Sequence, residues 1–330
     1  MTTMTIKSKV RTPGWGHNLR VIAVKEIRDA FKSRLFLIAL MMLFALTLIA
    51  IALGASTVHA RIAEYEQSAQ VLCDLGRTDI PPMPALNPLA VSKNFINYLA
   101  MIGALLAMIL GYSTIDKERK AGTLRLILSR PIYRDQLLTG KILGNAILLG
   151  MMLAFVGVLT VIGIAVLGGV SLTGDQLIKL MLTMVMSWLY TLVIFLLALF
   201  FTILVPDGKQ ALTLTVIIWL VFAFILPQIG DTMDLDNQLP GGFFAAMGLN
   251  EQQVLQKFQL YESVRDGIEE SSPTKHYERI SFALLGVKPE FTDNTWDEIL
   301  QLKLMNIVGM MVPIFVLASG SYVVFLRQDS

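Results

Sequence analysis

The chain has 330 residues, of which 55% are hydrophobic and 16% are charged, and its mean hydropathy is +0.63. A soluble domain usually carries about 25% charged residues, so the composition excludes a water-soluble protein of ordinary make-up. The formal net charge of +2 gives no indication of nucleic-acid binding, and we expect no nucleic-acid partner. The single cysteine, Cys73, excludes an internal disulfide.

Six apolar segments of the chain contain no charged residue. A transmembrane helix needs roughly 20 apolar residues to cross about 30 Å of hydrocarbon, and a charge at its centre costs about 2.5–3.5 kcal/mol. We therefore predict an all-α integral membrane protein with six transmembrane helices. These helices are expected near residues 35–54, 95–115, 144–168, 180–205, 211–229 and 304–326.

Six spans place both termini on one side of a membrane. The side with the termini, which also holds residues 114–143 and 206–210, has 17 basic and 7 acidic residues. The opposite side, with residues 55–94, 169–179 and 230–303, has 10 basic and 18 acidic residues. Positive residues favour the cytoplasmic side, so the pattern predicts a cytoplasmic (inner) membrane protein with both termini in the cytoplasm.

Residues 1–34 are predicted to form a cytoplasmic leader with an amphipathic helix that lies in the headgroup plane. The alternative is a plain extension of the first span. That span begins only at Leu35 and has 20 residues, which favours a true span over a cleaved signal peptide. The expected apolar face holds Leu19, Ala23, Ile27, Ala30 and Phe31, opposite Lys25, Arg28, Asp29 and Lys32.

Residues 35–229 are expected to contain the first five transmembrane helices. Between the first two, residues 55–94 are predicted to form an outer loop, because the sequence DIPPMPALNP at its end is too rich in proline for regular structure.

The link between the second and third spans, residues 114–143, is unusually long and basic. It has ten charged residues, seven of them positive. Gly122 is expected to end a helix that continues from the second span, and residues 123–129 to form a short amphipathic helix that Pro131 stops. From the residues alone two interpretations stay open: an apolar face that contacts a protein partner, or a helix that only rests on lipid.

Residues 230–303 are predicted to form a small helical extracytoplasmic segment, followed by the sixth span and a short cytoplasmic tail at 304–330. Asn250 and Gln253 indicate a capping box at the start of one helix. Ser272–Pro273 should start a second helix, which Gly286 should end. The third, opened by a capping box at 295–298, should continue into the last span.

Several chemistries lack their usual residues. The predicted spans contain no ionisable side chain, which argues against a pump driven by ions or protons. The sequence has no His-Glu-x-x-His motif for intramembrane proteolysis. Its histidines, His17, His59 and His276, all lie outside the predicted spans. It also has no Gly-x4-Gly-Lys-Ser/Thr loop, so this chain does not bind ATP by that route.

Two groups of possible metal ligands lack the spacing that a metal site needs. Asp231, Asp234 and Asp236 do not have the spacing of a calcium loop, so a solvated acidic loop is expected. Three residues that could bind a soft metal are scattered without paired spacing: Met83, Met233 and His276. We therefore predict no metal, cofactor or catalytic residue in this chain.

The link resembles the signature of ABC-2 type transporter permeases. It has Glu-x-x-x-Gly-Thr-Leu at 118–124, Leu-Ser-x-Pro at 128–131, Arg134 three residues on, and Gly140–Lys141 before the third span. The N-terminal sequence AVKEIRDAFKSRLFLI is similar to the interfacial entry helix of the same family. Within the family, the chain is most similar to the branch associated with multicopper-enzyme maturation, which includes the nitrous-oxide-reductase maturation permease.

This resemblance implies a permease subunit of an exporter that pairs with a second copy or a paralogue. Two cytosolic ATPase subunits, which bind the ATP and magnesium, would contact the link as a coupling helix. The residues assigned to this ATPase-coupling interface are Glu118, Arg119, Gly122, Thr123, Leu124, Arg125, Leu128, Ser129, Pro131 and Arg134.

Two other functions compete with an exporter subunit. A non-transporting scaffold could anchor an ATPase during maturation of an extracytoplasmic enzyme. A passive channel is disfavoured, because the predicted spans show no polar ring. The transported substrate is not indicated by the sequence.

Overall fold

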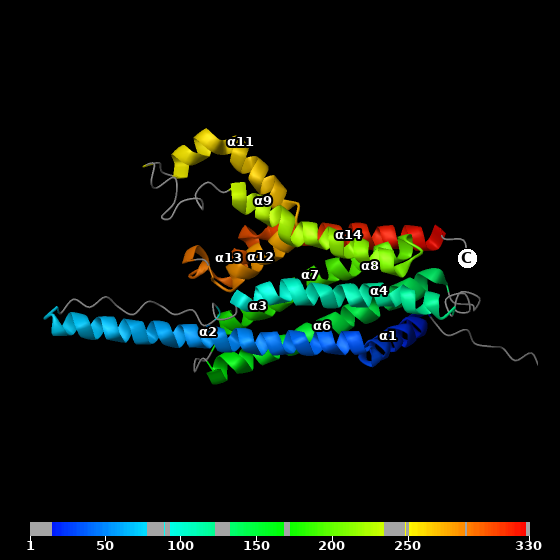
Figure 1. The fold of residues 1–330 in the computed structure, drawn as a ribbon, viewed down its shortest axis with the longest axis horizontal. Coiled ribbons are helices and arrows are strands. Elements are labelled where there is room, and N and C mark those ends of the chain that lie inside the picture. Colours follow the sequence, from blue (N-terminus) through cyan, green and yellow to red (C-terminus); the bar gives the residue numbers. More distant parts are fainter. Residues whose placement is uncertain are drawn as a thin grey trace, which may run out of the picture.

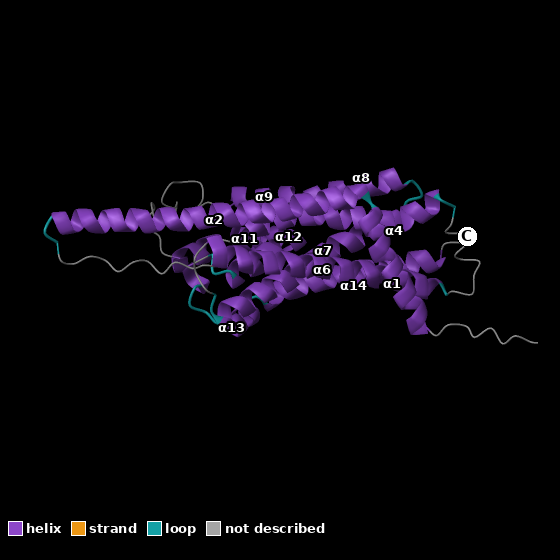
Figure 2. Cartoon of the chain, turned by 90° about the horizontal axis from the view of Figure 1, so that it is seen from below, coloured by secondary structure: helices purple, strands orange, loops and turns teal. Residues whose placement is uncertain are grey.

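The computed structural model describes residues 15–77, 89, 93–122, 133–167, 172–233, 248, 251–287 and 289–327. Within these residues every regular element is a helix, and Figure 2 shows no strand among them. The main α-helices are α1 (Trp15–Lys32), α2 (Arg34–Asp74), α3 (Lys93–Tyr98), α4 (Ala104–Lys120), α6 (Arg134–Leu167), α7 (Gly174–Leu204), α8 (Gly208–Leu220), α9 (Leu226–Met233), α11 (Glu251–Glu270), α12 (Pro273–Leu284), α13 (Trp296–Leu302) and α14 (Leu304–Arg327). Shorter elements are the π-helices η2 (Leu99–Gly103) and η3 (Val221–Ile225) and the 3-10 helix η5 (Pro289–Phe291).

Six helical runs in the described chain are long and apolar enough to cross a membrane. They lie side by side along the long axis of the molecule (Figure 1). This confirms the predicted all-α architecture of a multi-pass membrane protein. The runs are Arg34–Asp74, Asn94–Lys120, Arg134–Leu167, Gly174–Leu204, Gly208–Met233 and Leu304–Arg327.

The central element of the bundle is α7. It packs against α4, α6, α12 and α14, and it buries Tyr190, Phe195 and Leu199 completely. α2 and α1 pack on the other side of α6. The two ends of this bundle differ. We call the end where α1, the last turn of α4 and the first turn of α6 meet the link end, and the opposite end, where α12 packs, the α12 end (Figure 1).

The prediction that residues 55–94 form a loop from their start is wrong. α2 continues without a break to Asp74, and Figure 1 shows it extending beyond the other helices. The first charges after the apolar segment end the stretch suited to hydrocarbon, but they do not end a helix. No proline interrupts residues 34–74, and the first residue in a left-handed conformation is Gly76, with φ 74°.

The N-terminal helix α1 is separate from the first span. Ser33 between them has extended backbone (ψ 115°), so a plain extension of the span is wrong. α1 packs against α6 and buries Ala23 and Ala30 of the predicted face, together with Ile22 and Glu26. Its position in the headgroup plane stays a prediction.

Several helix ends were predicted correctly from local signals. α4 ends at Lys120, just before Gly122 with φ 67°. The Ser272 hydroxyl accepts from the backbone N–H of Lys275 at the start of α12, and Gly286 follows its end with φ 59°. The capping box at Thr295 opens α13 as predicted, but the prediction that this helix continues into the last span is wrong, because a turn at Lys303 separates α13 from α14. α11 begins at Glu251, whereas Asn250 lies outside the described residues.

Part of residues 230–303 lies deeper in the helix bundle than expected for the predicted small helical segment. α12 packs against α7, α14 and α3, and it buries Tyr277, Ile280 and Leu284. The Tyr277 ring stacks on Tyr190 of the fourth span, with ring centroids 4.8 Å apart. The apolar spacing of these residues along one helix face explains why α12 inserts between spans.

His276 of α12 should make the stability of this packing depend on pH. Its Nδ1 atom lies 3.1 Å from the Asn306 side chain on α14. Burial lowers the pKa of His276 below its ordinary value of 6.5, and Arg279 lowers it too, while the nearby Glu270 raises it by less. As the pH falls below 6.5, the unfolded chain binds a proton that the folded chain does not, so the free energy of unfolding decreases.

We therefore expect the midpoint temperature of thermal unfolding to decrease when the pH is lowered from about 7.5 to about 5.5. The decrease should be smaller in His276→Gln. Burial raises the pKa of Glu278 and so gives a trend of opposite sign, but both proteins share it. Thermal unfolding of the detergent-solubilised protein at the two pH values measures the difference. If the midpoint temperature depends equally on pH in both proteins, His276 is not the source of the pH dependence.

Candidate functional site

A group of four charged side chains, three of them buried, joins three helices at the link end. It consists of Lys25 and Glu26 of α1, Glu118 of α4 and Lys141 of α6, which we call the ion cluster. Glu118 lies three residues before Ala121, the residue that follows the end of α4. Lys141 lies two turns into α6. The ion cluster therefore sits where the link leaves one span and enters the next.

Lys141 is the centre of the ion cluster. Its side chain is 1% exposed, and its Nζ atom lies 2.8 Å from Glu26 Oε1 and 3.0 Å from Glu118 Oε1. Nζ also donates to the backbone carbonyl of Thr114 over 2.8 Å. Because an ammonium group has three donors, these three acceptors satisfy it. The Lys141 cation thus connects α6 to Glu26 of α1 and to Thr114 and Glu118 of α4.

The second cation, Lys25, lies at the rim of the ion cluster. Its Nζ atom is 2.5 Å from Glu118 Oε1, and its side chain is 46% exposed. Burial lowers the pKa of Lys25, but the hydrogen bond and charge of Glu118 and the charges of other carboxylates raise it more, so it lies above 10.5. Two cations and two carboxylates balance, which is the condition for burying charges together.

Further polar contacts hold the helix ends around the link. Arg119 donates to the backbone carbonyls of Val205 and Pro206, each over 2.9 Å, and so ties the end of α4 to the turn between α7 and α8. At the start of α6, Gln136 accepts a 3.2 Å hydrogen bond from Asn18 of α1. Both ends of the link are therefore fixed to neighbouring elements.

The residues predicted for the coupling interface divide into two groups. Glu118 belongs to the ion cluster, Arg119 binds the α7–α8 turn, Gly122 has the left-handed backbone that follows α4, and Arg134 is the first residue of α6. The remaining six lie outside the described residues: Thr123, Leu124, Arg125, Leu128, Ser129 and Pro131.

Sequence reasoning missed three members of the ion cluster. Lys25 was placed on the charged face of α1, Glu26 was not considered, and Lys141 appeared only within the Gly-Lys signature. Two signals were present. Glu26 is a lone acid on a face with Ala23 and Ala30, and Lys141 is a lone cation at the start of a long apolar run.

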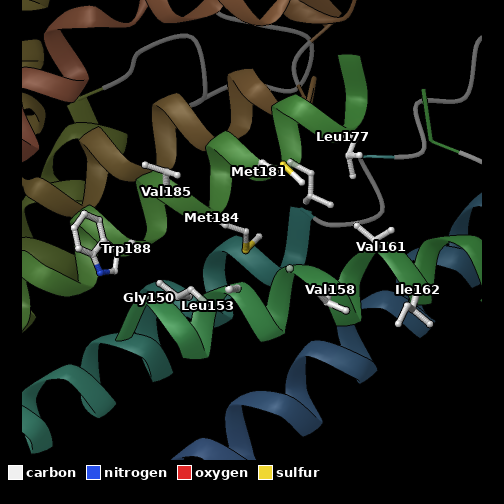
Figure 3. Close-up of a pocket in the computed structure, with 13 residues that line it drawn as sticks. Gly150, Leu153, Val158, Val161, Ile162, Leu177, Met181, Met184, Val185 and Trp188 are labelled. Carbon is white, nitrogen blue, oxygen red and sulfur yellow. The ribbon is translucent and has the colours of Figure 1, made fainter. Parts of the chain in front are cut away.

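A second feature of possible functional use is an apolar groove between α6 and α7. Its volume is about 620 Å³, and none of its lining residues is charged. Figure 3 shows Gly150 and Leu153 of α6 on one side and Met181, Met184 and Trp188 of α7 on the other. The Trp188 indole N–H donates to the Ala146 carbonyl over 2.8 Å, so it is not available to a ligand. The groove is therefore suited to hydrocarbon alone.

Comparisons with known proteins agree with the signature in the link. The profile of a family described as ABC-2 family transporter protein matches residues 20–330. Proteins named probable ABC transporter permease protein NosY are 30% identical over 130 residues in Pseudomonas aeruginosa and 33% identical over 131 residues in Stutzerimonas stutzeri. Each match covers 39% of this chain and 39% of the relative's length.

These findings confirm the resemblance inferred from the sequence, and the NosY relatives agree with the branch indicated there. The profile covers nearly the whole chain, including the ion cluster and all six spans. The chain belongs to the ABC-2 family of transporter proteins.

Proposed function

We propose that this chain is the membrane-spanning permease subunit of an ATP-binding-cassette exporter. A separate ATPase supplies the energy, and this subunit couples ATP hydrolysis to movement of a substrate across the cytoplasmic membrane. Family membership and the NosY permease relatives support the class of protein. The chain itself is not an enzyme in this proposal, because ATP and magnesium bind to the partner.

The observation that carries the proposal is the ion cluster. A motor that binds the link can change the membrane part only through contacts that differ between its states. Lys141 joins α6 to Glu26 of α1 and Glu118 of α4. Because a buried ion cluster strongly resists separation, a force on the link moves α1, α4 and α6 as one unit rather than bending a loop.

The proposed partners are those that membership of the family implies. A dimer of cytosolic ATPase subunits binds the link ends of two permease subunits, which are either two copies of this chain or this chain and a paralogue. The excess of 17 basic over 7 acidic residues on the side of the link supports its cytoplasmic location, with both termini there.

Leu124→Asp and Leu128→Asp should release the ATPase. Both leucines lie on the apolar face predicted for the link, and a carboxylate in a desolvated contact is strongly unfavourable. We expect the amount of ATPase that co-purifies with the permease to fall at least about tenfold, as for the loss of a central contact in an interface. Pull-down from detergent extracts and the ATPase rate of the recovered complex are the measurements.

Leu260→Asp is the matched control, because Leu260 lies on α11 with 81% of its surface exposed. It should leave both the complex and its ATPase rate unchanged. If the two link variants retain as much ATPase as Leu260→Asp, the link is not the coupling contact.

A membrane scaffold that anchors an ATPase without transport is the alternative function. Vesicles that contain the purified complex distinguish the two. A fluorescent phospholipid and a labelled amphipathic peptide are suitable probes, because the spans offer an apolar path. ATP-dependent movement of either probe excludes a pure scaffold, and ion currents through the permease without ATPase would instead indicate a channel.

A further inference from the structure

Two of the six spans contain a π-helical segment. In the second span η2 covers Leu99–Gly103, and in the fifth span η3 covers Val221–Ile225. A π-helical turn has one residue more than an α-helical turn, so it disturbs the regular ladder of backbone hydrogen bonds. Such segments are frequent at functional sites and at kinks. Both lie toward the α12 end of their spans.

Each π-helical segment has a backbone carbonyl that accepts a hydrogen bond from a distant side chain. The Ser272 hydroxyl, at the start of α12, donates to the carbonyl of Phe222 in η3 over 2.5 Å. The Tyr190 hydroxyl of α7 donates to the carbonyl of Ala100 in η2 over 2.9 Å. These bonds supply donors at the positions where the helical ladder is irregular.

The two bonds belong to one buried polar network centred on α12. The Tyr190 oxygen accepts from the Trp219 indole N–H over 3.2 Å and lies 3.4 Å from the Thr274 hydroxyl of α12. Tyr277 stacks on Tyr190, and its hydroxyl is 3.0 Å from that of Ser187. α12 is thus bonded to the fifth span through Ser272 and to the fourth span through Thr274 and Tyr277. It reaches the second span through Tyr190 and by packing on α3.

α12 is also bound to the sixth span, and its two ends are turns. His276 contacts Asn306 of α14 over 3.1 Å. Ser272 precedes α12 with extended backbone, and Gly286 follows it with φ 59°. A short helix between two turns can move as a unit if its side contacts are broken.

We propose that α12 is a latch that holds the α12 end of the bundle closed, and that η2 and η3 are the hinges released when it undocks. The proposal rests on the proposed function, since ATP binding by the partner drives the release. With α12 docked, Ser272 and Tyr190 hold both π-helical segments in one geometry. When α12 leaves, the fifth span loses the Ser272 bond directly. Tyr190 of α7 then loses its contacts with Thr274 and the stacked Tyr277, which hold its hydroxyl on the Ala100 carbonyl of the second span.

A cysteine at position 281 reports undocking. Ser281 on α12 is completely buried, and serine to cysteine changes one atom. The native Cys73 is exposed and is first replaced by serine. The full chain, purified with its ATPase and placed in lipid nanodiscs, which leave both faces of the bilayer accessible, is treated with a water-soluble maleimide, and the labelling rate of Ser281→Cys is measured with and without ATP and magnesium.

Ser272→Ala should raise the labelling rate about tenfold without ATP, since one hydrogen bond contributes this much to an opening equilibrium. Ser272→Thr, which keeps the hydroxyl and the helix cap, should label at the original rate. Ser271→Ala is the matched control, because the Ser271 hydroxyl donates only to the local carbonyl of Ile268, over 2.6 Å. ATP should raise labelling when the latch residues are intact.

Equal labelling in the Ser272→Ala and Ser271→Ala proteins would overturn the latch. Labelling that does not respond to ATP, in a complex that hydrolyses ATP, would overturn it as well and leave the proposed function standing. If no ATPase co-purifies, the proposed function fails, and the two variants without ATP still decide whether Ser272 holds α12 in place.

Discussion

Lys141→Met is expected to lower the free energy of unfolding by about 3–5 kcal/mol, because removal of one partner leaves buried charges uncompensated. Methionine has a similar length and no charge. Glu26 and Glu118 would then face each other across the space that Nζ occupies, where both lie within 3.0 Å of it. Unfolding of the purified protein in mixed micelles with increasing SDS measures the change.

Lys25→Met provides a graded comparison. Lys25 also contacts Glu118, but its side chain is 46% exposed and Glu118 keeps Lys141 as a partner. Its loss should therefore be about 1 kcal/mol or less. A Lys141→Met protein as stable as Lys25→Met would show that the ion cluster does not hold the three helices together.

Removing the negative charges together with the cation should restore stability. Glu26→Gln and Glu118→Gln, added to Lys141→Met, convert the three buried members of the ion cluster into neutral groups of nearly the same shape and leave only the half-exposed Lys25 charged. Replacing buried charges together is often neutral, so at least about half of the lost free energy should return. If the proposed function holds, the restored protein should still couple poorly to the proposed ATPase partner, because neutral side chains hold the three helices together less strongly.

The helix ends that were predicted correctly depend on few neighbouring residues. Gly122 and Gly286 adopt positive φ, and Ser272 caps the helix that follows it. Such signals act within about one helical turn, so they can be read in one short stretch of sequence. The six spans were predicted for a similar reason, because the requirement for about 20 apolar residues applies to each helix separately.

The ion cluster could not be predicted in this way. Glu26 and Lys141 are 115 positions apart in the chain, and only the packing of α1 against α6 brings them together. Read locally, Lys141 is one of many basic residues in a basic link. The π-helical segments have the same limitation, because their irregular backbone is supported by Ser272 and Tyr190 from other parts of the chain.

The long α2 shows a different limit. Hydropathy detects where a helix leaves hydrocarbon, whereas Gly76, with φ 74°, marks where this helix ends. The two positions coincide for many spans, but here about twenty residues separate them. The sequence between them has no proline, and its residues are compatible with the longer helix.

Gly144→Ala is expected to separate α1 from α6. A Cβ atom at position 144 would lie 2.8 Å from both the Cα and the carbonyl oxygen of Ala23, and 3.1 Å from Cβ of Glu26. Because the first two are backbone atoms, the whole of α1 must shift, and Glu26 would shift with it away from Lys141. We expect a loss of about 1–3 kcal/mol in the free energy of unfolding, as for other overpacked contacts.

Gly150→Ala on the same helix should have the opposite sign. Its nearest neighbour would be the Trp188 ring at 3.5 Å, an ordinary contact, and alanine favours a helix over glycine by about 1 kcal/mol. Trypsin cleavage within α1, at Lys25 or Arg28, should become faster only in Gly144→Ala. If both variants gain stability and α1 stays protected, α1 tolerates displacement, and close packing of α1 on α6 is not what holds Glu26 against Lys141.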